Sequence, residues 1–148
     1  MTQVDRDGPF FQKTVGSLIG GLIGDAIGTP TEGMSYRTIQ EKFGRVEDFD
    51  GDGTDDTVMK LLLAEALIRT DGSATQDDWA QIWLDQWDDI FGAKVGKFFQ
   101  SVLHTAAKLR LTRVPRMAAL GNLPSSSSAM CISPVGIVNA CNPSQAAA

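Results

Sequence analysis

The sequence predicts an all-α protein, because its apolar residues recur at helical spacing and no stretch alternates as a strand would. The clearest helix covers residues 54–70, where a polar start leads into a long apolar run. A second helix is expected at residues 14–27, where glycines recur every fourth position. Tryptophans at positions 79, 83 and 87 mark one face of a further helix.

The other elements follow from caps and breaks in the sequence. Thr75 is expected to cap the tryptophan helix, because Asp77 and Asp78 then lie in its first turn, where the helix dipole favours negative charge. No internal repeat is visible. In chain order, the remaining expected segments are a short helix at 35–43, a helix at 95–111, a break at 113–115, a polar loop at 120–128 and a buried helix at 129–140.

Two helix faces have specific expected roles. Glycine disfavours a helix by about 1 kcal/mol per residue relative to alanine, so the stripe formed by Gly16, Gly20, Gly24 and Gly28 indicates a second backbone packed very close. A plain contact between small residues explains such a stripe without any chemistry. The tryptophan face is expected to be a packed core face rather than a platform for base stacking.

Composition limits the classes of function. The net charge of −5 argues against a nucleic-acid partner, because phosphate backbones attract basic surfaces. The apolar run at 15–27 is too short and glycine-rich for a membrane span, and the first residues do not resemble a signal peptide. The two cysteines are too few for a disulfide framework, so cytoplasmic thiols are expected.

Thr54, Asp55, Asp56 and Thr57 form the most informative stretch of the chain. At a helix start, such side chains can accept hydrogen bonds from the first-turn N–H groups. They can also bind a hard cation through oxygen atoms. Adjacent helical side chains point about 100° apart, so one cap does not account for both carboxylates. Capping and metal binding both remain open from these residues alone.

The acidic loop before this helix has an alternative interpretation. Residues 48–53 match the first half of an EF-hand calcium loop. The twelfth position of that loop, where a bidentate Glu is needed, is Met59. Calcium coordination would therefore be incomplete.

The ordered motifs resemble those of the ADP-ribosylglycohydrolase family. The resemblance implies an all-α fold built around a binuclear metal site, usually with magnesium and sometimes manganese. It also implies cleavage of the glycosidic bond of an ADP-ribosyl group. The matching segments are Gly20 to Gly28, Pro30 to Gly33, Thr54 to Thr57 and, more weakly, Gly92 to Gly96 and Ser128 to Gly136.

The resemblance also assigns site residues. Thr54, Asp55 and Asp56 are the implied ligands of Mg²⁺, with two ions in the complete site and Mn²⁺ possible in their place. Glu32 is the implied catalytic acid or base, although without the family match an exposed turn carboxylate would be the preferred explanation. Cys131 and Phe98 depart from the family's usual residues, which bears on the substrate more than on the fold. The implied substrate-binding residues are Gly96, Ser125, Ser126, Ser127 and Ser128.

One expected motif is missing. The family's second metal motif, Asp-x-Asp-Thr, has no counterpart after Thr57. Residues 1–148 therefore correspond to the N-terminal portion of the domain, and a second polypeptide is expected to supply the complementary carboxylates. The alternatives are a truncated product and a non-catalytic or repurposed relative with a structural or binding role, or with other chemistry on a nucleotide-like substrate.

Overall fold

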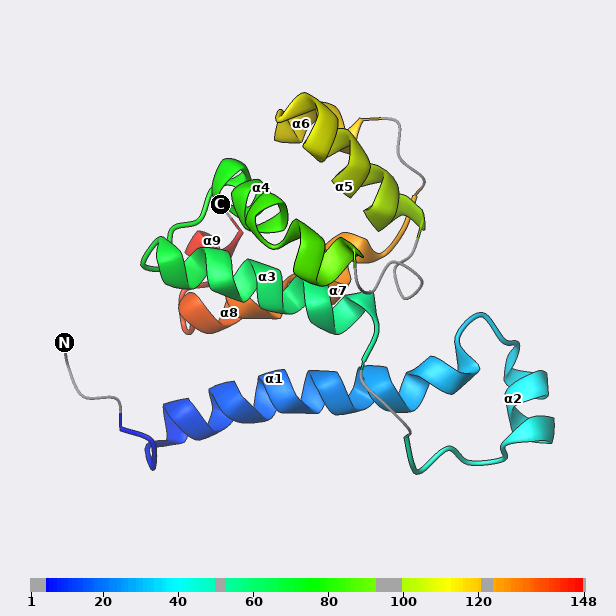
Figure 1. Ribbon diagram of the computed structural model, residues 1–148. Coiled ribbons are helices and arrows are strands. Elements are labelled where there is room, and N and C mark those ends of the chain that lie inside the picture. Colours follow the sequence, from blue (N-terminus) through cyan, green and yellow to red (C-terminus); the bar gives the residue numbers. More distant parts are fainter. Residues whose placement is uncertain (1–4, 50–52, 93–99, 121–123, 148) are drawn as a thin grey trace. The chain divides into compact units, whose positions relative to one another are not determined.

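The computed structural model describes residues 5–49, 53–92, 100–120 and 124–147 and divides into two compact units, Met1–Thr57 and Val58–Ala148. All regular structure in these ranges is helical, so the predicted all-α class is confirmed (Figure 1). None of the helices described is long and apolar enough to cross a membrane.

The first unit is built on one long helix. Helix α1 (Pro9–Gly28) begins earlier than the predicted residue 14, because Pro9 occupies a first-turn position where its missing N–H costs nothing. A 3₁₀ turn, η1 (Thr29–Thr31), follows directly. Helix α2 (Tyr36–Lys42) then forms as predicted, capped by the Ser35 hydroxyl, which accepts a hydrogen bond from the Thr38 N–H at 3.2 Å.

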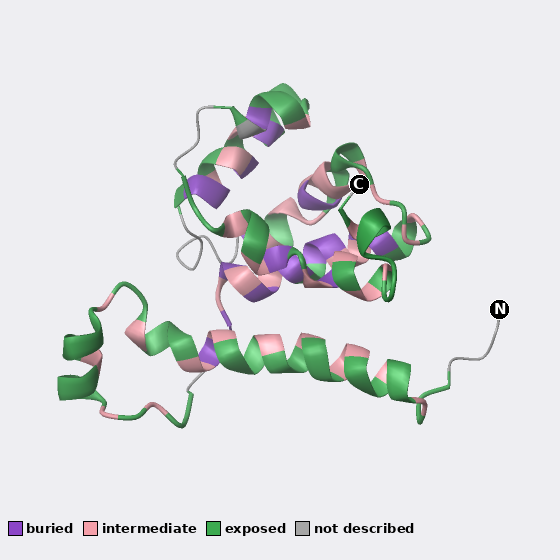
Figure 2. Cartoon of the chain, turned by 180° about the vertical axis from the view of Figure 1, so that it is seen from behind, coloured by how far each residue is buried: buried purple, intermediate pink, exposed green. Residues whose placement is uncertain are grey.

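The glycine stripe of α1 lies uncovered in the described structure. A Cβ atom added at Gly16, Gly20, Gly24 or Gly28 would meet no atom within 4 Å. Within the described residues of the first unit, the predicted close contact with a second backbone is therefore not formed. Figure 2 shows α1 mostly in the colours of exposed and intermediate residues. The large apolar side chains exposed on α1 are Phe10, Ile19, Leu22 and Ile23.

Helix α3 (Asp55–Arg69) starts in the first unit and supplies the centre of the second unit's core. It begins one residue after the predicted start, with Thr54 before it and both aspartates in its first turn. Leu62 is 2% exposed, whereas its neighbour Leu61 is 55% exposed, so the buried face is sharply defined. The other core residues on this helix are Met59, Leu63, Ala66 and Leu67.

Helix α4 (Gln76–Asp85) opens with the predicted cap. The Thr75 hydroxyl accepts from the Asp78 N–H at 3.3 Å, and the Asp78 carboxylate accepts from the Thr75 N–H at 2.8 Å. Hydrogen bonds from the Thr75 hydroxyl and N–H hold the pKa of Asp78 below its ordinary value. The two residues thus satisfy each other's free groups at the helix start.

Replacing Thr75 by alanine is expected to lower the free energy of unfolding by about 1 kcal/mol, because the first turn of α4 loses its side-chain acceptor. Urea unfolding followed by tryptophan fluorescence measures this change. Ser73→Ala, two residues earlier in an exposed turn, is the matched control and is expected to change little. Equal losses in both variants would contradict the capping role.

The tryptophan face packs into the core, as predicted. Trp83 is buried and meets Trp79 edge-on, with ring centroids 5.5 Å apart. Phe91 lies 5.4 Å from the Trp83 ring and 5.3 Å from the Trp87 ring. Trp87 itself belongs to a π-helical turn, η2 (Trp87–Gly92), which follows α4. These rings pack on one another, so they do not form an open stacking platform.

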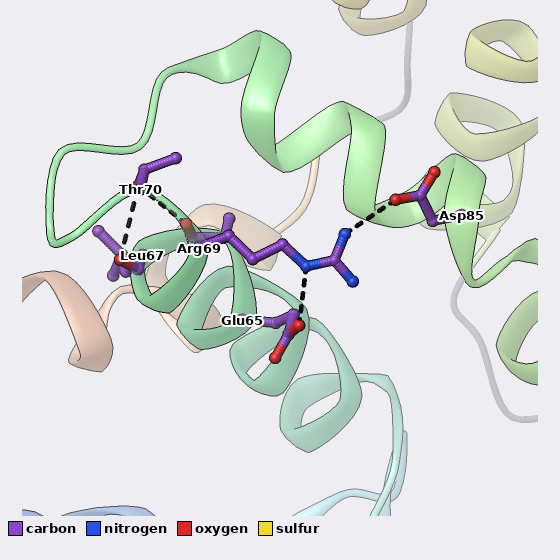
Figure 3. A network of polar contacts seen from close by, with 6 residues as sticks. Glu65, Leu67, Arg69, Thr70 and Asp85 are labelled. Atoms are coloured by element: carbon purple, nitrogen blue, oxygen red, sulfur yellow. Dashed lines mark hydrogen bonds and ion pairs between the residues drawn. The ribbon is translucent and has the colours of Figure 1, made fainter.

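Arg69 links α3 to α4 on the surface of the second unit (Figure 3). Its Nε donates to Glu65 at 2.8 Å, and its Nη1 donates to Asp85 at 2.9 Å. Both ion pairs are partly exposed and therefore stabilise the fold little, and only the pair of Arg69 with Asp85 joins the two helices.

Two helices follow residues 93–99, which lie outside the described ranges. Helix α5 (Gln100–Thr112) confirms the later part of the predicted 95–111 helix, whose start lies outside the described residues. The predicted break at 113–115 is confirmed by Arg113, whose φ of 57° ends the helix. Pro115 then opens the short helix α6 (Pro115–Ala119), which packs against α5.

The predicted single helix at 129–140 is wrong. The chain instead forms α7 (Ser127–Cys131) and α8 (Ser133–Val138), separated at Ile132. Pro134 explains the break, because a proline inside a helix lacks an N–H and clashes with the carbonyl four residues earlier. It is tolerated only in the first turn of α8. A last short helix, α9, covers Pro143–Ala146.

Candidate metal centre

The start of α3 places two carboxylates and a hydroxyl on consecutive residues. The Thr54 hydroxyl accepts from the Asp56 N–H at 3.4 Å, as a helix cap does. Asp55 is only 5% exposed, and Asp56 is partly buried. A buried carboxylate at this position is unusual for a residue that acts only as a solvated first-turn charge.

Asp25, near the end of α1, forms hydrogen bonds with the start of α3, although the two lie far apart in the sequence. Its Oδ2 accepts from the Thr54 N–H at 2.7 Å and from the Thr57 N–H at 3.1 Å. The Thr54 hydroxyl donates to Oδ1 at 2.8 Å, and the Thr57 hydroxyl donates to Oδ2 at 2.7 Å. One carboxylate thus receives four hydrogen bonds from residues 29 and 32 positions away.

Asp25 remains ionised because of these bonds. Burial raises the pKa of its carboxyl, but the hydrogen bonds from Thr57 and Thr54 outweigh burial and bring the pKa below its ordinary value. The carboxylate also caps the third helical residue of α3, whose N–H would otherwise lack a partner. Asp25 therefore caps α3 from another helix. In most helices, the capping side chain belongs to the residue just before the helix.

Gly53 makes this approach possible. A Cβ atom at this position would lie 2.5 Å from the Asp25 Oδ2 and 2.7 Å from the Thr57 hydroxyl oxygen. Real Cβ atoms do not approach so closely, so only glycine fits between the two without a rearrangement. The glycine before the helix start is thus required by a tertiary contact.

Glu32 lies at the end of η1, seven positions after Asp25. Its side chain is exposed and forms no hydrogen bond or ion pair among the described residues. Gly33 follows with a φ of 72°, a left-handed conformation that turns the chain after Glu32. The chain therefore presents Glu32 on a turn that follows directly from the helix carrying Asp25.

The predicted substrate-binding serines belong to the second unit. Ser125, Ser127 and Ser128 line a pocket of about 530 Å³, whereas Ser126 does not line it. Ser125 accepts from the Ser101 hydroxyl at 3.1 Å, and the Ser125 and Ser127 hydroxyls are 2.7 Å apart. The apolar wall of the pocket includes Met59, Trp79, Trp83, Val102, Leu109 and Met130. Gly96 lies outside the described residues.

The described carboxylates do not form a metal-binding cluster by themselves. Among the residues that the structure describes, no group of three or more His, Cys, Asp or Glu side chains is placed to bind a metal ion. The EF-hand alternative is contradicted in part, because Met59, its twelfth position, is buried in the core at 2% exposure. Two other positions of that loop, Asp50 and Asp52, lie outside the described residues.

An all-α fold is what the sequence resemblance implied, and two of the matching segments, Gly20 to Gly28 and Thr54 to Thr57, meet at the start of α3. Residues 6–148 match the ADP-ribosylglycohydrolase family, and the chain belongs to that family. The family is generally one of glycoside-cleaving hydrolases.

Two similar proteins are both described as uncharacterized proteins. One, from Archaeoglobus fulgidus, is 35% identical over an alignment that covers 40% of this chain and 22% of that protein. The other, YegU of Escherichia coli strain K12, is 29% identical over 84% of this chain and 41% of that protein. The chain thus spans less than half the length of these curated relatives. No solved structure matches it.

Sequence reasoning missed the role of Asp25. The residue stands inside a recognised motif, but nothing local indicates its partners. A usable signal was present: a lone carboxylate in an apolar, glycine-rich helix requires a polar partner, and Thr54 and Thr57 supply hydroxyls at helical spacing.

Proposed function

We propose that this chain is part of a metal-dependent glycosidase that cleaves a glycosidic bond of an ADP-ribosyl or related nucleotide-ribosyl substrate. Family membership supports the reaction class. The observation that carries the proposal is the fixed start of α3, where a buried Asp55 follows a Thr54 hydroxyl held by Asp25. A helix cap alone does not require the buried carboxylate.

The donor atoms at this helix start fit a hard cation. Mg²⁺ and Mn²⁺ prefer carboxylate and hydroxyl oxygens, and Thr54, Asp55 and Asp56 offer only such atoms. Magnesium usually keeps several water ligands, so a few protein oxygens per ion suffice. We assign these three residues as ligands on this chain, with two ions in the complete site.

The chain's own residues have separable roles in the reaction. When bound, Mg²⁺ supplies Lewis-acid polarisation and orientation of the ribose hydroxyls and water. Glu32, exposed on its turn, is proposed to hold or transfer a proton as the leaving group departs and the anomeric carbon develops oxocarbenium character. Asp55 and Asp56 would orient the substrate through the bound cation.

Substrate binding is proposed for the serine segment. Hydroxyl groups of Ser125, Ser127 and Ser128 stand at the pocket of the second unit and can donate to phosphate or ribose oxygens. Ser126 and Gly96, the other two residues that the resemblance implies, are also proposed to bind the substrate. The chain's net charge of −5 means that a pyrophosphate would need such donors or cations to offset repulsion.

The remaining ligands are proposed to come from a second polypeptide that carries an Asp-x-Asp-Thr motif. The chain spans 41% of YegU, so a large part of the relative's length has no counterpart here. The apolar residues exposed on α1 are consistent with a surface that a partner covers. Neither Cys131 nor Cys141 forms a disulfide within the described part of the chain, which fits the proposed cytoplasmic location.

A second candidate is a non-catalytic or repurposed relative with a structural or binding role. The absence of a three-carboxylate cluster within the described residues favours it over a self-sufficient enzyme. Cation binding separates the two candidates, because a purely structural relative has no need of it.

Mg²⁺ is expected to raise the melting temperature of the wild-type chain, because a ligand that binds only the folded state stabilises it by about 2.7 kcal/mol at one hundred times its dissociation constant. The double replacement of Asp55 and Asp56 by asparagine is expected to abolish this response. Thermal unfolding across a magnesium titration measures it, and Mn²⁺ serves as a second probe.

The matched control replaces Asp88 and Asp89 by asparagine. These are also adjacent aspartates in a first helical turn, but both are exposed and belong to η2. The control is expected to keep the full magnesium response. A response that survives the Asp55/Asp56 replacement would refute the metal assignment.

A further inference from the structure

We propose that Asp25 is the positioning residue of the metal site, orienting the Thr54 hydroxyl so that its oxygen faces a cation. This inference rests on the proposed metal-binding function. Asp25 would not be a ligand itself, and its effect on the cation would pass through Thr54.

The hydrogen bonds of the Thr54 hydroxyl leave its oxygen able to bind a cation. A threonine hydroxyl has one donor and two acceptor positions. Its proton is donated to the Asp25 Oδ1 at 2.8 Å, and one acceptor position faces the Asp56 N–H at 3.4 Å. Among the residues that the structure describes, no group occupies the second lone pair, which can face a cation. A carboxylate that accepts a ligand's proton also makes the ligand oxygen more basic, as in known metal sites.

The rest of the contact fixes the orientation. The Asp25 Oδ2 accepts from the Thr54 N–H, the Thr57 N–H and the Thr57 hydroxyl, so the turn is held on both sides of the two aspartates. Gly53 lets the carboxylate lie against the backbone, since a Cβ there would be 2.5 Å from Oδ2. Such a network resists rotation of the Thr54 side chain, which a solvent-exposed cap would not.

Only a carboxylate makes this set of contacts with the Thr54 hydroxyl as the donor. All four groups that face Asp25 are donors, and a carboxylate accepts at both oxygens. Asparagine has the same shape but only one acceptor oxygen. With that oxygen at the Oδ2 position, its NH₂ group would donate to the Thr54 hydroxyl, which reverses that hydrogen bond and turns the Thr54 proton toward the cation. The two N–H groups would then bond to a neutral oxygen, a weaker acceptor than a carboxylate. Asp25→Asn therefore changes hydrogen bonding with little change in volume. Asp7→Asn, on an exposed residue before α1, is a control with the same change in charge.

The first measurement needs no metal. Amide hydrogen exchange of the full chain is expected to quicken at Thr54 and Thr57 in Asp25→Asn and to stay unchanged in Asp7→Asn. Circular dichroism establishes that both variants are folded. Should Asp25→Asn not fold, Thr57→Val, which removes one hydroxyl and keeps the shape, takes its place. Unchanged protection at these two amides would overturn the positioning role.

The second measurement is the Mn²⁺ affinity of the full chain by calorimetry. Asp25→Asn is expected to weaken binding about 10–100-fold, as loss of a ligand's supporting group does. Thr54→Val should weaken it too, and the double variant should lose no more than the larger single loss, because both changes remove one interaction. Additive losses, or wild-type affinity in folded Asp25→Asn, would overturn the inference. If the wild-type chain bound no Mn²⁺, the proposed function itself would fail.

Discussion

Leu62→Ala is expected to lower the free energy of unfolding by about 2–5 kcal/mol, whereas Leu61→Ala should change it by less than about 0.5 kcal/mol. The two leucines are neighbours on α3, but Leu62 is 2% exposed in the core and Leu61 is 55% exposed. Truncating the buried side chain removes apolar contacts and leaves a cavity that neighbouring groups fill only in part. Small domains have about 5–15 kcal/mol of stability, so this loss is a large share.

Urea unfolding of the full chain, followed by tryptophan fluorescence, measures the difference between the two leucine variants. The buried Trp83 makes fluorescence a direct report on this core. Equal losses at the two positions would mean that α3 is rotated about its axis relative to the structure described. A larger loss at Leu61 would mean that the wrong face of α3 is buried.

Much of the fold could be predicted because its signals are local. The helix that begins after Thr54 and the capping box of Thr75 and Asp78 depend on residues within one turn of each other. The tryptophan face follows from helical spacing alone. The split at Ile132 was missed because apolar composition favoured one helix over 129–140, while Pro134 decided the outcome through its backbone.

The residue types of the candidate site could be predicted from the sequence, but the hydrogen bonds that hold those residues in place could not. Thr54, Asp55 and Asp56 stand out as oxygen donors at a helix start, and the structure places them on one turn. The hydrogen bonds that hold this turn come from Asp25, whose separation of 29 residues leaves no local trace. Gly53 ends the acidic loop before this helix, and only the structure shows that its lack of a side chain admits that carboxylate.

The glycine stripe shows the limit of inference from one helix. Four glycines at one face indicate a close neighbour, and the described residues of the first unit provide none within 4 Å of an added Cβ atom. Each glycine destabilises the helix by about 1 kcal/mol relative to alanine, and no packing contact within the first unit offsets this loss. A partner that packs on the stripe would supply such a contact, in keeping with the proposed second polypeptide.

The chain purified from its native source is therefore expected to form a complex heavier than its own 15.9 kDa. Size-exclusion chromatography with light scattering gives the mass, and intact-mass analysis identifies the second polypeptide, which should carry an Asp-x-Asp-Thr segment. A well-folded monomer without partner or self-association would contradict the prediction.

Gly20→Ala tests where that partner packs, because it should have opposite effects on the free chain and on the complex. In the free chain, an added Cβ at Gly20 meets nothing within 4 Å, so alanine should stabilise α1 by up to about 1 kcal/mol. In the complex, the same methyl group would enter a close backbone contact and weaken association. Gly136→Ala on α8, where an added Cβ is equally unobstructed, is the control and should leave association unchanged. Equal association of both variants and the wild type would place the partner away from the glycine stripe.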